Sequence, residues 1–137
     1  MPQGVTLSNG SFSRDFAERM KAYYRFADPD GRYAERRLRQ WEGDGGVILY
    51  EAKRESGLLG WIVYRPDSST LEEILVRKGE AKGLEGAIVD ALIDRESLVS
   101  AEVLKEDEGK YRWMIEYGFR PTRRRGRGGP WPSRRRR

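Results

Sequence analysis

The apolar positions in the first third of the chain recur at helical intervals. Ser13 is a residue type that commonly caps helices, and from it apolar side chains follow every three or four residues up to Tyr24. Residues 31–42 repeat this pattern, with apolar side chains mainly on one side and charged ones on the other. The chain is therefore predicted to open on two amphipathic helices.

The middle of the chain changes to runs rich in β-branched and aromatic residues, which favour strands. Strand and helix patterns then alternate. The predicted elements are a hairpin of strands at 47–54 and 58–65, a strand at 71–76, a helix at 84–93, a short strand at 98–104, and a helix at about 107–117 that ends at Gly118.

The β-type run at 71–76 leads through a glycine-rich loop into a helical period, which is typical of a strand, loop and helix unit. We expect 71–76 to be the central strand of a mixed sheet. The helix after it is expected to pack through Leu84, Ile88, Ala91 and Leu92.

The charge of the chain is divided between two segments. Residues 120–137 contain nine of the 27 basic residues and none of the 22 acidic ones, so the net charge of +5 divides into −4 for residues 1–119 and +9 for the rest. The second segment also has low complexity and few apolar residues. We predict one folded α/β domain at 1–119 and a disordered arginine-rich tail at 120–137.

The chain contains neither histidine nor cysteine, which limits its chemistry. Disulfides, thiolate nucleophiles, imidazole bases and the usual zinc ligands are excluded, so we expect no metal site. Acid–base chemistry must then use carboxylates, tyrosine, lysine or water. The absence of cysteine, of a signal-like N-terminus and of a long apolar run predicts a soluble cytoplasmic protein with no membrane span.

Two motifs carry a family resemblance, at 76–86 (VRKGEAKGLEG) and at 111–119 (YRWMIEYGF). With the order of predicted elements, they resemble the GNAT superfamily of acyl-CoA-dependent N-acetyltransferases over most of residues 12–121. The resemblance implies an α/β (α+β) fold with a mixed, mainly antiparallel sheet and helices on both faces. It also implies transfer of an acyl group from acetyl-CoA to an amine.

The first motif is similar to the family's pyrophosphate-binding loop, in which backbone N–H groups at a helix N-terminus approach the phosphates. Aligned on Gly83, Glu80 and Glu85 stand where the family has a Gln or Arg and a small residue. Two carboxylates at this place predict that acetyl-CoA binds weakly or not at all. The residues that the resemblance assigns to the cofactor are Val76, Gly79, Lys82, Gly83, Leu84 and Gly86.

The resemblance also implies catalytic residues. A glutamate on the central strand often acts as the general base, and Glu72 and Glu73 occupy that stretch, on opposite faces if the strand alternates regularly. The family's proton-donating tyrosine is replaced by Met114. Tyr111 and Tyr117 lie one turn away on either side and are the alternative proton donors.

The arginine-rich tail is expected to bind polyanions, because guanidinium groups pair with phosphates and stack on bases. We expect it to bind nucleic acid or a ribonucleoprotein, with an acidic protein or a membrane surface as alternatives. A second hypothesis is therefore a catalytically inactive GNAT-fold protein that docks through this tail. The residues assigned to it are Arg123, Arg124, Arg125, Arg127, Trp131, Arg134, Arg135, Arg136 and Arg137.

Overall fold

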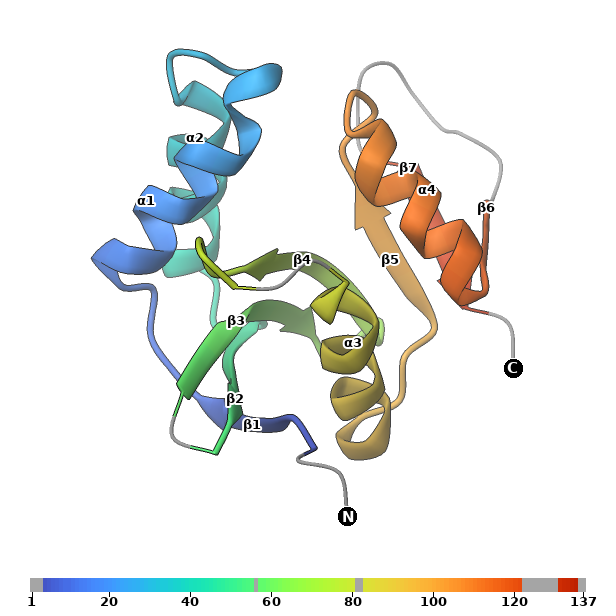
Figure 1. Ribbon diagram of the computed structural model, residues 1–137. Coiled ribbons are helices and arrows are strands. Elements are labelled where there is room, and N and C mark those ends of the chain that lie inside the picture. The colour runs from blue at the N-terminus through green and yellow to red at the C-terminus, as the bar shows by residue number, and fades with distance from the viewer. Residues whose placement is uncertain (1–3, 56, 81–82, 122–130, 136–137) are drawn as a thin grey trace.

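A seven-stranded sheet forms the centre of the computed structural model (Figure 1), which describes residues 4–55, 57–80, 83–121 and 131–135. The strand order is β1-β2-β3-β4-β5-β7-β6. The pair β4 and β5 is parallel and all other neighbours are antiparallel. The strands are β1 (Thr6–Asn9), β2 (Ile48–Arg54), β3 (Gly57–Arg65), β4 (Thr70–Val76), β5 (Ser100–Val103), β6 (Phe119–Pro121) and β7 (Trp131–Arg135).

Helices cover both faces of this sheet. They are α1 (Arg14–Tyr23), the short 3-10 helix η1 (Tyr24–Phe26), α2 (Arg32–Glu42), α3 (Leu84–Arg95) and α4 (Glu108–Tyr117). Phe16 and Met20 of α1 and Trp41 of α2 are buried in the core of one face. Ile88 of α3 and Met114 of α4 are buried in the core of the other face. Both cores are apolar, so their burial provides the main favourable free energy of folding.

The predicted helices and long strands are confirmed, with bounds that differ by a few residues. Strand β4 lies fourth of seven, at the centre of the sheet as expected. All four side chains predicted to anchor α3 belong to the core of that face or pack against it. Ser13 caps α1 by accepting a hydrogen bond from the backbone N–H of Phe16, at 3.3 Å.

Three short strands were not predicted: β1, β6 and β7. Strand β1 buries only Leu7, so its four residues show no repeated alternation. Strand β7 lies within the segment predicted to be a tail, and it pairs with β5 (Val103 opposite Trp131) and with β6. Within the segment predicted as a tail, residues 120–121 and 131–135 are strand residues of the sheet, because the open edge of β5 supplies backbone partners that local composition does not reveal. Residues 122–130 and 136–137 lie outside the described residues.

No helix in the described ranges has the length and apolar character needed to cross a membrane.

Candidate functional site

A β-bulge on the central strand places two adjacent carboxylates on the same face of the sheet. Val63 of β3 pairs with Glu73, but the next residue of β3, Tyr64, pairs with Leu71, so Glu72 is an extra residue on β4. A bulge of this kind interrupts the alternation of side chains. Leu71 and its partner Tyr64 face the α3 core, whereas Glu73 shares a face with Val63, in the α1 and α2 core.

Glu72 also points to the α1 and α2 side, where it contacts Trp41 of α2. The prediction that the two glutamates lie on opposite faces is therefore wrong. The alternation rule fails at this place because one extra residue returns the chain to the same face.

Strands β4 and β5 separate just before the two carboxylates. They pair only at Thr70 with Ser100 and Leu71 with Ala101, and the hydroxyls of Thr70 and Ser100 lie 3.0 Å apart. Beyond this point β5 runs away from β4 (Figure 1). Glu73 lies two residues beyond Leu71, the last residue of β4 that pairs with β5, so side chains from other elements complete its surroundings.

Those side chains come from η1 and α4. Lys110 of α4 donates to Glu73, with 2.5 Å between Nζ and Oε2, and to the Tyr24 hydroxyl at 3.0 Å. The Tyr24 hydroxyl in turn donates to the Glu73 carboxylate at 2.7 Å. The Lys110 and Glu73 side chains are only 3% and 2% exposed. The cluster is thus a buried ion pair whose polar atoms have partners, as buried charges require.

Asp107 ties the start of α4 to α1 beside this pair. Its carboxylate accepts the backbone N–H of Lys110 at 3.0 Å, which caps the helix, and the hydroxyl of Tyr23 at 2.8 Å. Contacts from α1 and η1 therefore meet contacts from α4 where β4 and β5 separate.

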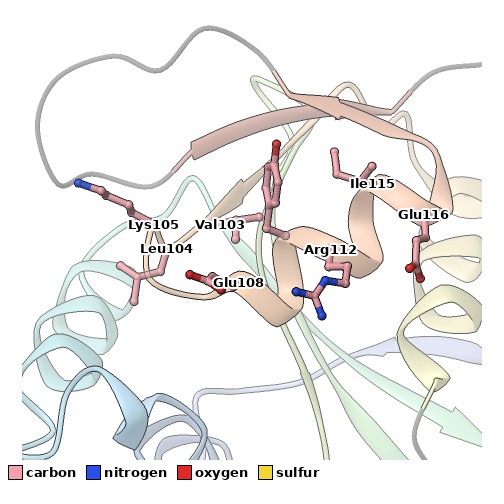
Figure 2. A pocket seen from close by; sticks show the side chains of 8 residues that line it. Val103, Leu104, Lys105, Glu108, Arg112, Ile115 and Glu116 are labelled. Atoms are coloured by element: carbon pink, nitrogen blue, oxygen red, sulfur yellow. The ribbon is translucent and has the colours of Figure 1, made fainter.

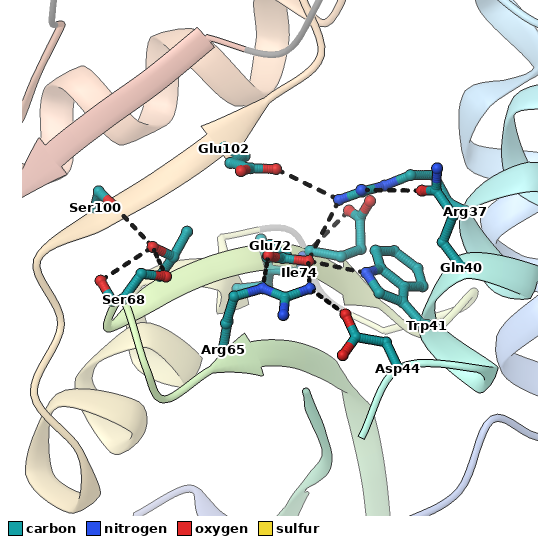
Figure 3. A network of polar contacts seen from close by, with 12 residues as sticks. Arg37, Gln40, Trp41, Asp44, Arg65, Ser68, Glu72, Ile74, Ser100 and Glu102 are labelled. Atoms are coloured by element: carbon teal, nitrogen blue, oxygen red, sulfur yellow. Dashed lines mark hydrogen bonds and ion pairs between the residues drawn. The ribbon is translucent and has the colours of Figure 1, made fainter. Parts of the chain in front are cut away.

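Glu72 belongs to a second network that faces α2 (Figure 3). Its carboxylate accepts from Arg65 Nε at 2.5 Å and from the Trp41 indole at 3.0 Å. Arg65 also pairs with Asp44 at 2.7 Å, and Arg37 pairs with Glu102 of β5 at 3.4 Å. These partners fix Glu72 as a link between α2 and the sheet, which leaves Glu73 as the carboxylate beside a proton donor.

Negative charge exceeds positive charge around the separation of the strands. Burial, followed by the charge of Glu72, raises the pKa of the Glu102 carboxyl, while Arg37 lowers it by less. The two networks together contain five carboxylates and three cations. The carboxylates are Asp44, Glu72, Glu73, Glu102 and Asp107, and the cations are Arg37, Arg65 and Lys110.

Three tyrosines near Glu73 are held in the protonated form. Burial, followed by the charge of Asp107, raises the pKa of Tyr23 well above its ordinary value of 10.0. Burial and the charge of Glu73 do the same for Tyr24 and, to a lesser extent, for Tyr33. In each case the phenolate would be a buried anion beside a carboxylate.

We expect the free energy of unfolding to fall steeply above pH 10. Below pH 10 these tyrosines are protonated in both states; above it the unfolded chain loses their protons and the folded chain keeps them. Each group then costs up to about 1.4 kcal/mol per pH unit. Urea unfolding between pH 9 and 11 measures the slope, and Tyr24→Phe should make it shallower. An unchanged free energy over this range would contradict the assignment.

The loop between β4 and α3 ends in a helix start without a side-chain cap. Gly83 is the N-cap residue with φ 87°, a conformation that favours glycine, and nothing lies within 4 Å of where its Cβ would be. The first N–H groups of α3 are thus approachable, as in the predicted phosphate loop. The Glu85 carboxylate lies close enough to Tyr23 to raise the pKa of that tyrosine, so the negative charge of Glu85 acts on the end of α1. Lys82 lies outside the described residues.

Neither tyrosine proposed as proton donor lies in the cluster around Glu73. Tyr117 donates a hydrogen bond to Asp90 of α3, and its ring lies against Gly86. Tyr111 lines a pocket of about 640 Å³ with residues of β5 and α4 that include Val103 and Ile115 (Figure 2). The structure brings Glu72 and Glu73 together and leaves these two tyrosines apart from them.

Lys110 is the site residue that the sequence interpretation missed. It lies four residues before Met114, on the same side of α4, and both side chains are buried. The sequence signal for Lys110 is a lysine that falls on the apolar side of a helix whose apolar positions are otherwise periodic.

Comparison with solved structures identifies the fold. PaiA N-acetyltransferase from Thermoplasma acidophilum, in complex with coenzyme A, has a TM-score of 0.62 at 11% identity, covering 98% of this chain and 99% of that chain. A putative GNAT-family acetyltransferase from Desulfovibrio desulfuricans has a TM-score of 0.62 at 16% identity, covering 95% and 96%. Campylobacter jejuni N-acetyltransferase PseH, in complex with acetyl coenzyme A, has a TM-score of 0.58 at 15% identity, covering 94% and 96%.

The protein therefore has the fold of the GNAT acetyltransferases, as the two sequence motifs suggested. No protein-family model and no curated protein sequence matches the chain.

The residues predicted to bind nucleic acid fall mostly outside the described part of the chain. Trp131, Arg134 and Arg135 belong to β7. The others, Arg123, Arg124, Arg125, Arg127, Arg136 and Arg137, lie outside the described residues. Within the described residues, no group of three or more carboxylates could hold a metal ion.

Proposed function

We propose that the protein is an acyl-CoA-dependent N-acyltransferase that acylates a primary amine. The observation that carries this proposal is the buried Glu73 carboxylate, which the bulge holds where β4 and β5 separate, on the strand that precedes the uncapped start of α3. A carboxylate in this position supplies the proton acceptor that an amine needs when it attacks a thioester. The excess of carboxylates over cations favours an acceptor that arrives as a cation.

Glu73 is the general base in this proposal, and neighbouring groups bind its carboxylate by hydrogen bonds. The Tyr24 hydroxyl and the backbone N–H of Ile74 both donate to its carboxylate. These bonds fix the position of the carboxylate on β4. Glu72 is bound by the Arg65 guanidinium and by the Trp41 indole of α2, whereas Glu73 lies beside Lys110, so the role of Glu72 is to hold α2 against the sheet.

The β4–α3 loop suits an acyl-CoA through its backbone. Gly83 leaves open space beside the first N–H groups of α3, and Arg77 and Lys78 are exposed at the start of the loop. Glu80 and Glu85 oppose the charge of a pyrophosphate. When bound, acyl-CoA supplies the activated thioester; the chain supplies the N–H donors for its phosphates and the proton acceptor for the amine.

We expect Glu85→Gln to bind acetyl-CoA about tenfold more tightly than the wild-type protein. Removing one carboxylate near a pyrophosphate relieves a repulsion of about 1 to 4 kcal/mol, and 1.4 kcal/mol is a factor of ten. Calorimetric titration measures the dissociation constant at low salt. Asp94→Asn, in the last turn of the same helix, is the matched control with unchanged affinity. Equal affinities for Glu85→Gln and the wild type would place the phosphates elsewhere.

A second activity, binding of nucleic acid by the arginine-rich segment, is proposed from the division of charge along the chain. Nine arginines without an acid follow a body of net charge −4. Phosphates attract such a segment with little regard to base sequence. We place both activities in the cytoplasm, whose reducing conditions suit a chain without cysteine.

Replacing the arginines at 123, 124, 125 and 127 by glutamine should weaken binding of labelled single-stranded RNA about tenfold or more at low salt, because several phosphate contacts are lost. The same four positions changed to lysine form the control, which keeps the charge and the affinity. These variants leave β7 in place, which truncation after Phe119 would not. Fluorescence anisotropy measures both; equal binding by the glutamine variant and the wild type would rule out the segment.

A further inference from the structure

We propose that Lys110 donates the proton to the leaving thiolate and that Glu73 then returns a proton to it, so the two form a self-restoring proton relay. This inference rests on the proposed acyltransfer. Its starting point is a missing proton donor. The position where the resemblance implies a tyrosine holds Met114, which has no proton to donate. Lys110 lies one helical turn earlier on the same side of α4.

The geometry places the ammonium group between β4 and η1. Its Nζ lies 2.5 Å from Glu73 Oε2 and 3.0 Å from the Tyr24 hydroxyl, and its side chain is 3% exposed. Lysine carries three N–H donors, and the Asp107 carboxylate, 3.9 Å from Nζ, is too far away for a hydrogen bond, so one N–H remains for a further acceptor while the two hydrogen bonds are kept. The third N–H is the one that would meet the leaving sulfur.

Tyr24 is the competing donor in this cluster. Its hydroxyl already donates to Glu73, and burial together with the Glu73 charge raises its pKa well above 10.0. A phenol in that state releases its proton less readily than an ordinary tyrosine. Tyr24 therefore serves as the hydrogen-bond partner that orients Lys110 and Glu73.

An acceptor that arrives as a cation first releases one proton to water, because only a neutral amine can attack, and the remaining protons balance between Glu73 and Lys110. The amine nitrogen forms a bond to the acyl carbon, the carbon–sulfur bond breaks, and the electron pair leaves with the sulfur. The amine loses one proton to the Glu73 carboxylate, and the thiolate takes one from the Lys110 ammonium. Proton transfer from the neutral Glu73 carboxyl to the neutral Lys110 amine, across their hydrogen bond, then restores the ion pair.

The chain offers an unusual chemical test because it contains no cysteine. Lys110→Cys introduces a unique thiol, and alkylation of the unfolded variant with bromoethylamine followed by refolding rebuilds an ammonium group at nearly the same distance. The sulfur in the rebuilt side chain makes its amine more acidic than that of lysine. Lys110→Arg is the second variant: it keeps a cation for Glu73 but cannot release a proton.

We expect Lys110→Cys and Lys110→Arg to lower kcat by about 100-fold or more, with acetyl-CoA affinity by calorimetry close to the wild-type value. Aminoethylation should restore kcat and shift the alkaline limb of its pH profile to lower pH. Wild-type kcat in Lys110→Arg, or an unshifted limb in the aminoethylated protein, would overturn the role of Lys110 while leaving the acyltransfer standing. A wild-type protein that binds acetyl-CoA but acylates no amine would overturn both.

Discussion

Glu73→Gln is expected to lower kcat for acyl transfer by about 10²- to 10⁴-fold, the usual contribution of a general base. Glutamine preserves the shape of the side chain and can still accept the Tyr24 hydrogen bond, but it cannot take up the amine proton. The loss should appear in kcat, with the affinity for acetyl-CoA unchanged. Release of CoA thiol in the presence of a saturating amine is the measurement.

The neighbouring Glu72→Gln provides the matched comparison. Glu72 is also buried, at 8% exposed against 3% for Glu73, and its carboxylate binds Arg65 and Trp41, so its loss should destabilise the fold and leave kcat near the wild-type value. If Glu72→Gln lowered kcat in this way and Glu73→Gln did not, the base would be Glu72 and the relay through Lys110 would fail with it.

Lys110→Met is expected to lower the free energy of unfolding by about 3 to 5 kcal/mol at pH 7, because it leaves the Glu73 carboxylate buried without a cation. Methionine has a similar length, so lost packing contributes little. Chemical denaturation of the two proteins measures the difference.

The double variant Glu73→Gln with Lys110→Met distinguishes the effect of removing the whole ion pair from the effect of removing one partner. With neither charge present, stability should recover to near the wild-type value, since a buried ion pair is often no better than neutral side chains of the same volume. A double variant as unstable as Lys110→Met alone would show that the destabilisation comes from packing.

The long elements were predictable from the sequence because each carries its signal over many residues. Helix α2 keeps a helical period over 11 residues, and strands β2 and β3 are runs rich in β-branched and aromatic residues. Strand β1 buries one side chain, and β7 finds its partner in β5, which is distant in sequence. Short elements, and strands that pair with a distant segment, show no repeated pattern in the local sequence.

The candidate site was predicted in part. Strand β4 and its two glutamates were identified, but regular alternation placed them on opposite faces, and only the pairing of Tyr64 with Leu71 reveals the bulge. Lys110 was overlooked because a lysine in a helix is usually solvated. Its burial depends on Glu73, which is 37 residues away along the chain. Contacts of this range are set by the tertiary fold.

The most direct test of the proposed acyltransferase is amine-dependent release of CoA thiol from acetyl-CoA by the wild-type protein, with Glu73→Gln assayed beside it. Primary amines of different size and charge serve as acceptors, and the acylated product is identified by mass. We predict thiol release that depends on both amine and wild-type protein and that falls by about 100-fold or more in Glu73→Gln. Thiol release no faster in the wild type than in Glu73→Gln, with every amine, would contradict the proposed function.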